Sequence, residues 1–410
     1  MTDRPDESAL GALWDDEDAL PIELVGGQTR RFTLSKDSSQ RLDKFLQNRV
    51  KGFSRHQIQK LIELGGIVLN EQVDKKPKPS SKLRQGDVID IRLPPRPSMN
   101  LEPEPIPLDI LHEEEGFLVI NKQANLIVHP ARGRQTGTLL NALTHHFQKT
   151  GQAQGESHAD QTLSDLGRDD ARPGVIHRLD MNTTGVIVVG KQVQTHWKIA
   201  KQFEDRTNLK AYLALVHGCP PEPGGAIDQP LGKHLTIREA QCVRHDDQGK
   251  ESLTLYRVRE RYRGYSLVEC ELKSGRTHQI RVHMSYIGCP LVGDIPYGGL
   301  PVGLPEIEDP PHPPAARPYL NYARAKEEGL KMEAAAVRRA DAGEFIMATP
   351  ALHAALLRIN HPDTGKLMTF TAPVHSLMRD LITRLRQHPD DGPTVTDGTH
   401  VDLALALGKD

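Results

Sequence analysis

A proline-rich polar segment, PPRPSMNLEPEPIP at residues 94–107, is the feature that most limits how this chain can fold. Such a composition is typical of a semi-rigid, extended linker. The chain of 410 residues is also longer than one ordinary hydrophobic core requires. We therefore expect a linker at residues 94–108 that separates a small domain at 30–93 from a larger domain at 109–388.

The charges are distributed unevenly along the chain, although the formal net charge is only −2. Residues 1–29 hold eight acidic side chains and one basic side chain, and residues 30–96 hold sixteen basic and seven acidic side chains. The acidic segment 1–29 has few apolar positions and is predicted to be disordered. The basic domain suggests a polyanionic partner such as nucleic acid, and a solvated basic face is the alternative interpretation.

The longest apolar run is only the few residues 211–216, far too short to span a bilayer, and the first residues are acidic where a signal peptide is basic. The four cysteines, at positions 219, 242, 270 and 289, show no CxxC spacing. This usage suits a reducing compartment and gives no indication of a zinc or disulfide framework. We expect a cytoplasmic protein without membrane contact, without a bound metal and, since no oligomerisation segment is evident, monomeric.

The basic domain begins with two short amphipathic helices followed by short strands. Leu42, Phe45 and Leu46 share one helical face, and residues 58–62 repeat that spacing before Gly65 ends the second helix. Asp43 belongs to the first turn, where a carboxylate complements the helix dipole, so the triplet Arg-Leu-Asp at 41–43 is interpreted as structural.

This domain resembles the S-four-type RNA-binding module shared with a ribosomal small-subunit protein, with SRHQIQKLIELGGIVLNEQ at 54–72 as the core of the match. In that module, basic residues of the helix pair contact the RNA backbone, which positions RNA without reading its sequence. The resemblance implies this role for the following residues: Arg41, Lys44, Arg55 and Lys60.

The larger domain is predicted to be α+β, built on a large mixed, mainly antiparallel sheet. The segments FLVINKQ, GVIVVGK and KAYLALVHG read as strands, GVIVVGK as a fully buried one, and YSLVECELKSG alternates as a half-buried strand does. A helix is expected at 196–205 with Trp197, Ala200 and Phe203 on its apolar face. We predict insertions at about 151–170 and 299–349, the second containing an exposed helix, and a flexible tail at 389–410.

Asp180 lies in a loop of turn-forming residues, MNTTG, that leads into the buried strand GVIVVGK. A short connection at the rim of a rigid sheet is a common place for a reactive group. The alternative is a structural Asp that forms a turn or pairs with Arg178.

A second polar cluster is SGRTHQIRVH at 274–283. If this segment is extended, Gln279, Arg281 and His283 share one face, and a guanidinium there can hold Asp180 ionised. The alternative is a polar edge strand. Tyr212 can stack on a base or act as an acid or base, and a tyrosine buried in the core is the alternative.

These motifs together resemble the RluA-type pseudouridine synthases, isomerases that act on uridines of ribosomal and transfer RNA. The matching segments follow the family's order over most of residues 110–385 and are LVINKQANLIVHPARG, RPGVIHRLD with MNTTGVIVVGK, QFEDRTNLKAYLALVHG, GRTHQIRVHMSYIGCPLVGDIPYGG and LHAALLRINHPDTGKLMTFTAP. The chain departs from the family at residues 122–125, where Asn125 replaces a Gly of the turn, and at TPALHA (349–354), where an Arg-Gln pair is usual. Asn tolerates a left-handed conformation, so the turn can persist.

The resemblance implies that Asp180 is the nucleophile, that Arg281 forms a salt bridge to it, and that Tyr212 belongs to the active site. It further implies a set of residues for base flipping and substrate binding: Arg178, His177, Arg276, His278 and Gln279. Isomerising uridine involves no redox change, so no cofactor or metal is expected. Attack on the anomeric carbon and removal of the ribose 2′-hydrogen remain alternatives for the role of Asp180.

The appended RNA-binding module suggests large-subunit (23S) ribosomal RNA as the substrate, with transfer RNA as the alternative. A non-catalytic RNA-binding or ribosome-assembly factor is a second hypothesis, although no catalytic position is substituted. A hydrolase that uses an Asp nucleophile on small molecules is a third, and it would leave the basic module without a purpose.

Overall fold

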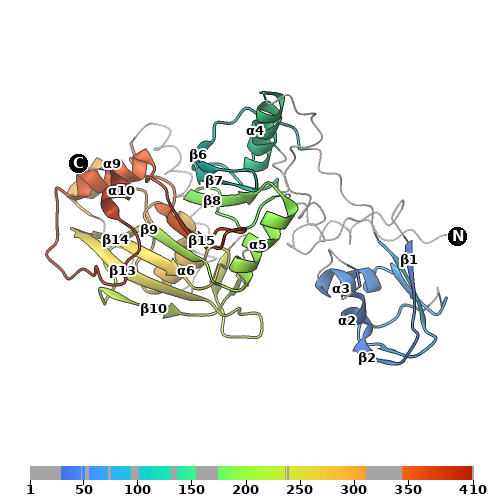
Figure 1. Cartoon of the computed structure of the whole chain (residues 1–410). Helices are drawn as coiled ribbons and strands as arrows, with labels where there is room; N and C mark the ends of the chain where they lie inside the picture. Colours follow the sequence, from blue (N-terminus) through green and yellow to red (C-terminus); the bar gives the residue numbers. More distant parts are fainter. Residues whose placement is uncertain are drawn as a thin grey trace. The chain divides into compact units, whose positions relative to one another are not determined.

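The computed structural model describes residues 29–47, 49–50, 55–72, 75–93, 101–130, 136–153, 174–235, 237, 240–310 and 344–408. These residues form two compact units, the first mainly from the chain before residue 102 and the second from Glu102 onward (Figure 1). None of the helices in the described ranges is long and apolar enough to cross a membrane. Most of the predicted acidic tail, most of the insertion at 151–170 and the centre of the insertion at 299–349 lie outside the described residues.

The first unit is a small α/β fold with two helices and two antiparallel sheets, ordered β1-β5-β3 and β2-β4. Its elements are β1 (Thr29–Thr33), β2 (Ser38–Arg41), α2 (Leu42–Gln47), α3 (Arg55–Glu63), β3 (Ile67–Leu69), β4 (Lys82–Leu83) and β5 (Val88–Arg92). The apolar residues predicted to share helical faces, including Leu42, Leu46 and Ile58, are fully buried in one core. Gly65 has φ 78°, a left-handed conformation that favours glycine after a helix end.

The second unit is built on a nine-stranded sheet in the order β10-β13-β14-β9-β15-β8-β7-β6, with β16 paired to β15. Only the pair β8–β15 is parallel, and the other neighbours are antiparallel. The strands are β6 (Asp109–Glu113), β7 (Phe117–Lys122), β8 (Thr184–Gly190), β9 (Leu209–His217), β10 (Gly224–Asp228), β13 (Leu253–Tyr262), β14 (Tyr265–Leu272), β15 (Leu352–Asn360) and β16 (Leu367–Thr371). The predicted α+β class with a large mixed, mainly antiparallel sheet is confirmed.

Short helices and a ribbon complete the second unit. They are α4 (Leu139–Ala153), α5 (Val193–Glu204), the ribbon β11 (Leu231–Lys233) with β12 (Gln241–Val243), α6 (Gln279–Tyr286), the 3-10 turn η2 (Ile295–Tyr297), α7 (Leu304–Glu308), α9 (Ser376–Leu385) and α10 (Leu403–Leu407). Figure 1 shows α9 and α10 side by side near β9 and β14, with which they form one hydrophobic core.

Strands β8 and β15 are neighbours in the sheet over only a short stretch and then diverge. These strands pair only at Thr184 with His353 and at Gly185 with Ala354. A β-carbon on Gly185, whose φ is 107°, would lie 2.2 Å from the carbonyl oxygen of Ala354, so only glycine permits this approach. Further along β8, Val189 bridges to Val175 instead. The segment that carries Asp180 therefore joins the sheet where β8 and β15 diverge.

The C-terminal residues are ordered, and the prediction of a flexible tail at 389–410 is wrong for the described part, residues 389–408. Val401 and Leu407 are buried with α9 in the main core. The amide of Val374 donates to the carbonyl oxygen of Ala406 at 2.7 Å. Because the segment is mostly polar, its composition did not indicate that these few apolar residues are buried.

Strand β14 is buried on both faces, so the prediction of a half-buried strand is wrong. Its fully buried Glu269 pairs with Arg259 and accepts a hydrogen bond from the amide of His400 at 2.6 Å. The C-terminal segment thus covers the face that the alternating pattern had assigned to solvent. A buried charge is stable here because both ionic and backbone partners satisfy it.

Three other expectations need correction. Trp197 is 61 % exposed, and α5 buries Thr195, His196 and Ile199 instead. Residues 102–108 are attached to the second unit rather than forming a free linker, since the side-chain amide of Asn141 donates to the carbonyl oxygen of Glu102 at 2.8 Å. The predicted insertion at 299–349 is too wide, because residues at both of its ends belong to the core: Val302, Ile307 and Met347.

Candidate active site

Asp180 lies in a short loop immediately before β8, and its side chain is 21 % exposed. The amide of Thr183 donates to the carbonyl oxygen of Asp180 at 3.1 Å and closes the predicted turn. The next carbonyl, that of Met181, accepts a hydrogen bond from the Lys122 ammonium at 3.0 Å. The loop is thus fixed by its own turn and by β7, while the carboxylate still reaches solvent.

Arg281 connects two carboxylates. Its Nη1 donates to Asp180 Oδ2 at 3.2 Å, and its Nε and Nη2 donate to the two oxygens of Asp294 at 2.8 Å each. Burial lowers the pKa of Arg281, but the charge and hydrogen bonds of Asp294 and the charge of Asp180 raise it more, so the net shift is upward. The expected contact between Arg281 and Asp180 is present, and the guanidinium is a permanent cation beside the carboxylate.

Arg281 belongs to a helix, α6, so the extended conformation considered for this segment is not present. Gln279 and His283, four residues apart, occupy one helical face, where both contact the hydroxyl of Thr254, at 3.0 and 2.8 Å. Arg281 is between them in sequence and contacts Asp180 and Asp294 instead. Period-two alternation fails because the helix turns about 100° for each residue.

His278 precedes α6 in a left-handed conformation, φ 56°. Its Nδ1 lies 2.6 Å from the Tyr297 hydroxyl, which also accepts a hydrogen bond from the Gln241 amide at 3.0 Å. This pattern lets Tyr297 donate to Nδ1 and assigns the ring proton to Nε2, which faces Asp180 Oδ2 at 3.7 Å. Burial lowers the pKa of His278, and the charge of Asp180 opposes that shift.

Tyr212, on β9, is 6 % exposed. Burial raises its pKa, and the charge of Asp180 raises it further, so the phenol stays neutral. Its strand neighbours Ala211 and Leu213 are part of the core beneath α9. Since side chains alternate along a strand, Tyr212 lies on the other face of the sheet, where Asp180 is.

His177 supports the loop, and its contact with the substrate stays a prediction. Its Nε2 accepts a hydrogen bond from the amide of Val188 at 3.1 Å, and its ring stacks on Phe203 with the ring centroids 4.7 Å apart. Burial, and then the charge of Lys210, lower the pKa of His177 to about 3. Arg178, the next residue, is exposed, and so is Arg276, whose Nε donates to the carbonyl oxygen of Glu251 at 3.3 Å.

Asp294 and Tyr297, both in the motif GDIPYGG, are two residues of the site that the sequence patterns did not predict. Lys122 is a third such residue, which the sequence indicated only as part of a turn. The Lys122 ammonium is fully buried and donates to three carbonyl oxygens, those of Gln123, Leu126 and Met181, at 2.8 to 3.0 Å. Burial lowers the pKa of Lys122 and the charge of Asp180 opposes this shift, so that the net pKa is about 7. Three acceptors match the three N–H groups of the charged form.

The first unit carries the other Arg-Leu-Asp triplet in a structural role, as predicted. Asp43 is fully buried and accepts hydrogen bonds from Arg41 at 3.1 Å and from Gln59 at 2.7 Å. Arg41 is about half exposed, Lys44 is exposed, and Lys60 lies 3.9 Å from Glu63. The side chain of Arg55 lies outside the described residues. Contact of these side chains with RNA stays a prediction.

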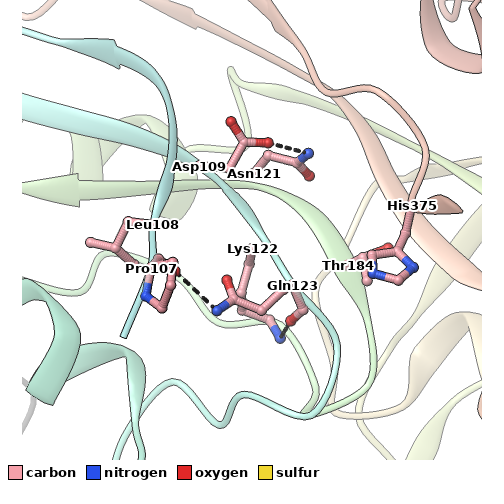
Figure 2. Close-up of a pocket in the computed structure, with 8 residues that line it drawn as sticks. All are labelled: Pro107, Leu108, Asp109, Asn121, Lys122, Gln123, Thr184 and His375. Atoms are coloured by element: carbon pink, nitrogen blue, oxygen red, sulfur yellow. Dashed lines mark hydrogen bonds between the residues drawn. The ribbon is translucent and has the colours of Figure 1, made fainter. Parts of the chain in front are cut away.

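A pocket of about 550 Å³ reaches Thr184, the first residue of β8 after the loop that carries Asp180, and Figure 2 shows its lining residues. Its lining consists of Pro107, Leu108, Asp109, Asn121, Lys122, Gln123, Thr184 and His375. Within it the side chain of Asn121 donates to Asp109 at 2.9 Å, and that of Gln123 donates to the Pro107 carbonyl oxygen at 3.1 Å. Asp180 is not part of the lining, so this pocket is separate from the carboxylate that Arg281 holds.

Comparison with known proteins identifies both units. The family model for RNA pseudouridylate synthase matches residues 116–286, and the model for the S4 domain matches residues 40–89. An uncharacterized RNA pseudouridine synthase of Bacillus subtilis is 33% identical over 353 residues, which is 86% of this chain and 96% of that protein. Ribosomal large subunit pseudouridine synthase D of Haemophilus influenzae is 33% identical over 356 residues, which is 86% of this chain and 94% of that protein. Among solved structures, human RNA pseudouridylate synthase domain containing 4 aligns with 22% identity and a TM-score of 0.45, covering 69% of this chain and 95% of that one.

Proposed function

The chain belongs to the RNA pseudouridine synthases, and we propose that it isomerises specific uridines in large-subunit ribosomal RNA, with Asp180 as the reactive carboxylate. The support for the RNA target is the similarity to relatives named for the large ribosomal subunit, together with the S4 domain. The observation that carries the role of Asp180 is its contact with Arg281, a buried guanidinium fixed on its other side by Asp294.

In this reaction the bond between the ribose anomeric carbon and uracil nitrogen 1 breaks, and a bond to uracil carbon 5 forms. The hydrogen on carbon 5 leaves as a proton and nitrogen 1 gains one, so atoms and electrons balance without an oxidant. Asp180 either attacks the anomeric carbon or removes the ribose 2′-hydrogen. Arg281 orients the carboxylate for both routes. The neutral phenol of Tyr212 offers a ring against which the base can pack.

The target uridine has to leave its stack to reach Asp180, which costs a few kcal/mol. Arg178 is exposed two residues before Asp180, which supports a role for its side chain in filling the space that the base leaves. His278 presents an N–H toward Asp180 and is a candidate donor to the sugar or base. The basic side chains of the S4 domain add affinity for the RNA backbone.

Tritium release tests this proposal. Large-subunit ribosomal RNA labelled with tritium at uracil carbon 5 loses label to water when pseudouridine forms. We expect release by the wild type, none by Asp180→Asn, and normal release by Asp397→Asn, a matched change at an exposed position of the same unit. Release from transfer RNA alone would contradict the assigned target, and release by Asp180→Asn at the wild-type rate would contradict the assigned carboxylate.

A further inference from the structure

Lys210 is a half-buried cation near the candidate active site that the proposed reaction does not use. It lies on β9 two residues before Tyr212, so the two side chains project from the same face of the sheet. Its Nζ lies 5.4 Å from the centre of the Phe203 ring, which in turn stacks on His177. Lys210 is thus held beside the segment that leads to Asp180.

The described part of the chain provides no anion beside Lys210. Within the described ranges, no ion pair between Lys210 and a carboxylate is present, and the charge that lowers its pKa, after burial, is that of Arg206, another cation. An ammonium removed from water needs acceptors for its three N–H groups, and an aromatic face supplies only part of that stabilisation. The hydrogen-bonding and charge requirements of Lys210 and Arg206 are therefore only partly satisfied until an anion binds.

Gly275 keeps the space beside Lys210 open. A β-carbon on Gly275 would lie 3.2 Å from Lys210 Nζ, tighter than ordinary van der Waals contact. Gly275 and Arg276 are both exposed and belong to the connection between β14 and α6, the helix that carries Arg281. An anion approaching from solvent can therefore reach Lys210 past a residue without a side chain.

From this geometry we infer that Lys210, with Arg206, binds a backbone phosphate of the substrate RNA next to the target nucleotide. The inference rests on the proposed function for the identity of the RNA. Two residues of strand separate Lys210 from Tyr212 by about 7 Å along β9, so a phosphate at Lys210 and a base at Tyr212 belong to the same short stretch of RNA. Lys210 acts in binding and does not touch the reacting atoms.

The test compares Lys210→Met with Lys149→Met, which removes the same charge from an exposed position on α4. Binding of a large-subunit ribosomal RNA transcript is measured across a series of salt concentrations, and tritium release is measured in single turnover with protein in excess. We expect Lys210→Met to bind about tenfold more weakly, with the slope of log affinity against log salt reduced by roughly one. Lys210→Arg should restore both values. The single-turnover rate at saturation should stay near that of the wild type.

Affinity and salt slope for Lys210→Met equal to those of Lys149→Met would overturn the inference. Binding of inorganic phosphate that Lys210→Met loses, together with an RNA affinity that Lys210→Met keeps, would assign the site to a free anion and also overturn the inference. Absence of tritium release by the wild type would instead contradict the proposed function, whatever the binding data show.

A second measurement covers the case in which Lys210→Met does not fold. Burial, and then the charge of Arg206, lower the pKa of Lys210 to about 8. A bound phosphate favours the protonated amine, so the RNA affinity of the wild type should fall as pH rises through about 8, and that of Lys210→Arg should not. The charged or titratable side chains recorded beside Lys210 are Arg206 and His177, and burial holds the pKa of His177 far below this range, at about 3. A wild-type affinity that follows that of Lys210→Arg from pH 7 to pH 9 would overturn the inference.

Discussion

Asp294 binds Arg281 through both carboxylate oxygens, at 2.8 Å each, which leaves Nη1 of the guanidinium to meet Asp180. We predict that Asp294→Asn lowers the catalytic rate constant about 10- to 100-fold while changing KM little, since a misplaced reactive group slows the chemical step. Removing one partner of a buried ion pair should also lower the free energy of unfolding by about 3 kcal/mol. Tritium release kinetics and urea unfolding measure the two effects.

Asp397→Asn is the matched control for this change because Asp397 is exposed. If Asp294→Asn lost only stability and kept the wild-type rate constant when folded, Asp294 would be structural and would have no part in positioning Arg281.

Acidic pH should destabilise the protein partly through His177. Burial lowers its folded pKa to about 3, below the unfolded value near 6.5, so the unfolded chain binds the extra proton between these values. The contribution of neutral His177 to the free energy of unfolding is therefore fully present above about pH 6.5. It is lost as pH falls, and the loss at pH 5 is about 2 kcal/mol. Urea unfolding of His177→Gln, which keeps a hydrogen-bond acceptor for Val188, should depend less on pH. The exposed His245, changed to Gln, should leave the wild-type dependence intact.

The features that local sequence patterns determine were predictable. All seven residues of β8 are buried, as a continuous apolar run indicates, and Asn125 adopts the expected left-handed conformation with φ 57°. The turn at Asp180 follows from its turn-forming neighbours. A guanidinium beside Asp180 was considered from the residues for an extended segment, and the family resemblance implied the salt bridge with Arg281; the contact is present, but a helix provides it.

Features that depend on distant partners were not predictable. The polar side chains of α6 face inward to Thr254 and Asp294, so no apolar periodicity reveals a helix there. Asp294 lies in a Gly- and Pro-rich turn, where an Asp usually has only a local role. Glu269 is buried by His400 and Val401, which are more than 130 residues away in sequence. The pattern of residues along β14 contains no information about a distant segment that packs over it.

The ordered C-terminal segment should contribute to stability. Leu407 is 5 % exposed and Leu405, in the same short helix α10, is 66 % exposed. Leu407→Ala should lower the free energy of unfolding by about 2 to 5 kcal/mol, as for other leucines truncated in a core. Leu405→Ala should change it by less than about 0.5 kcal/mol. Equal effects of the two substitutions in thermal or urea unfolding would show that the segment is not packed in solution.

Gly185 should tolerate no side chain, because it combines φ 107° with the close approach to the carbonyl oxygen of Ala354. Gly185→Ala forces β8 away from β15 directly after the loop that carries Asp180, so we expect a loss of about 3 kcal/mol in stability together with reduced tritium release. Gly365→Ala is the control, since Gly365 also has a positive φ, 68°, but nothing within 4 Å of an added β-carbon. It should cost only the backbone strain of about 1 kcal/mol and leave activity unchanged. Similar losses in both variants would show that strain alone, and not the contact between β8 and β15, makes glycine necessary at position 185.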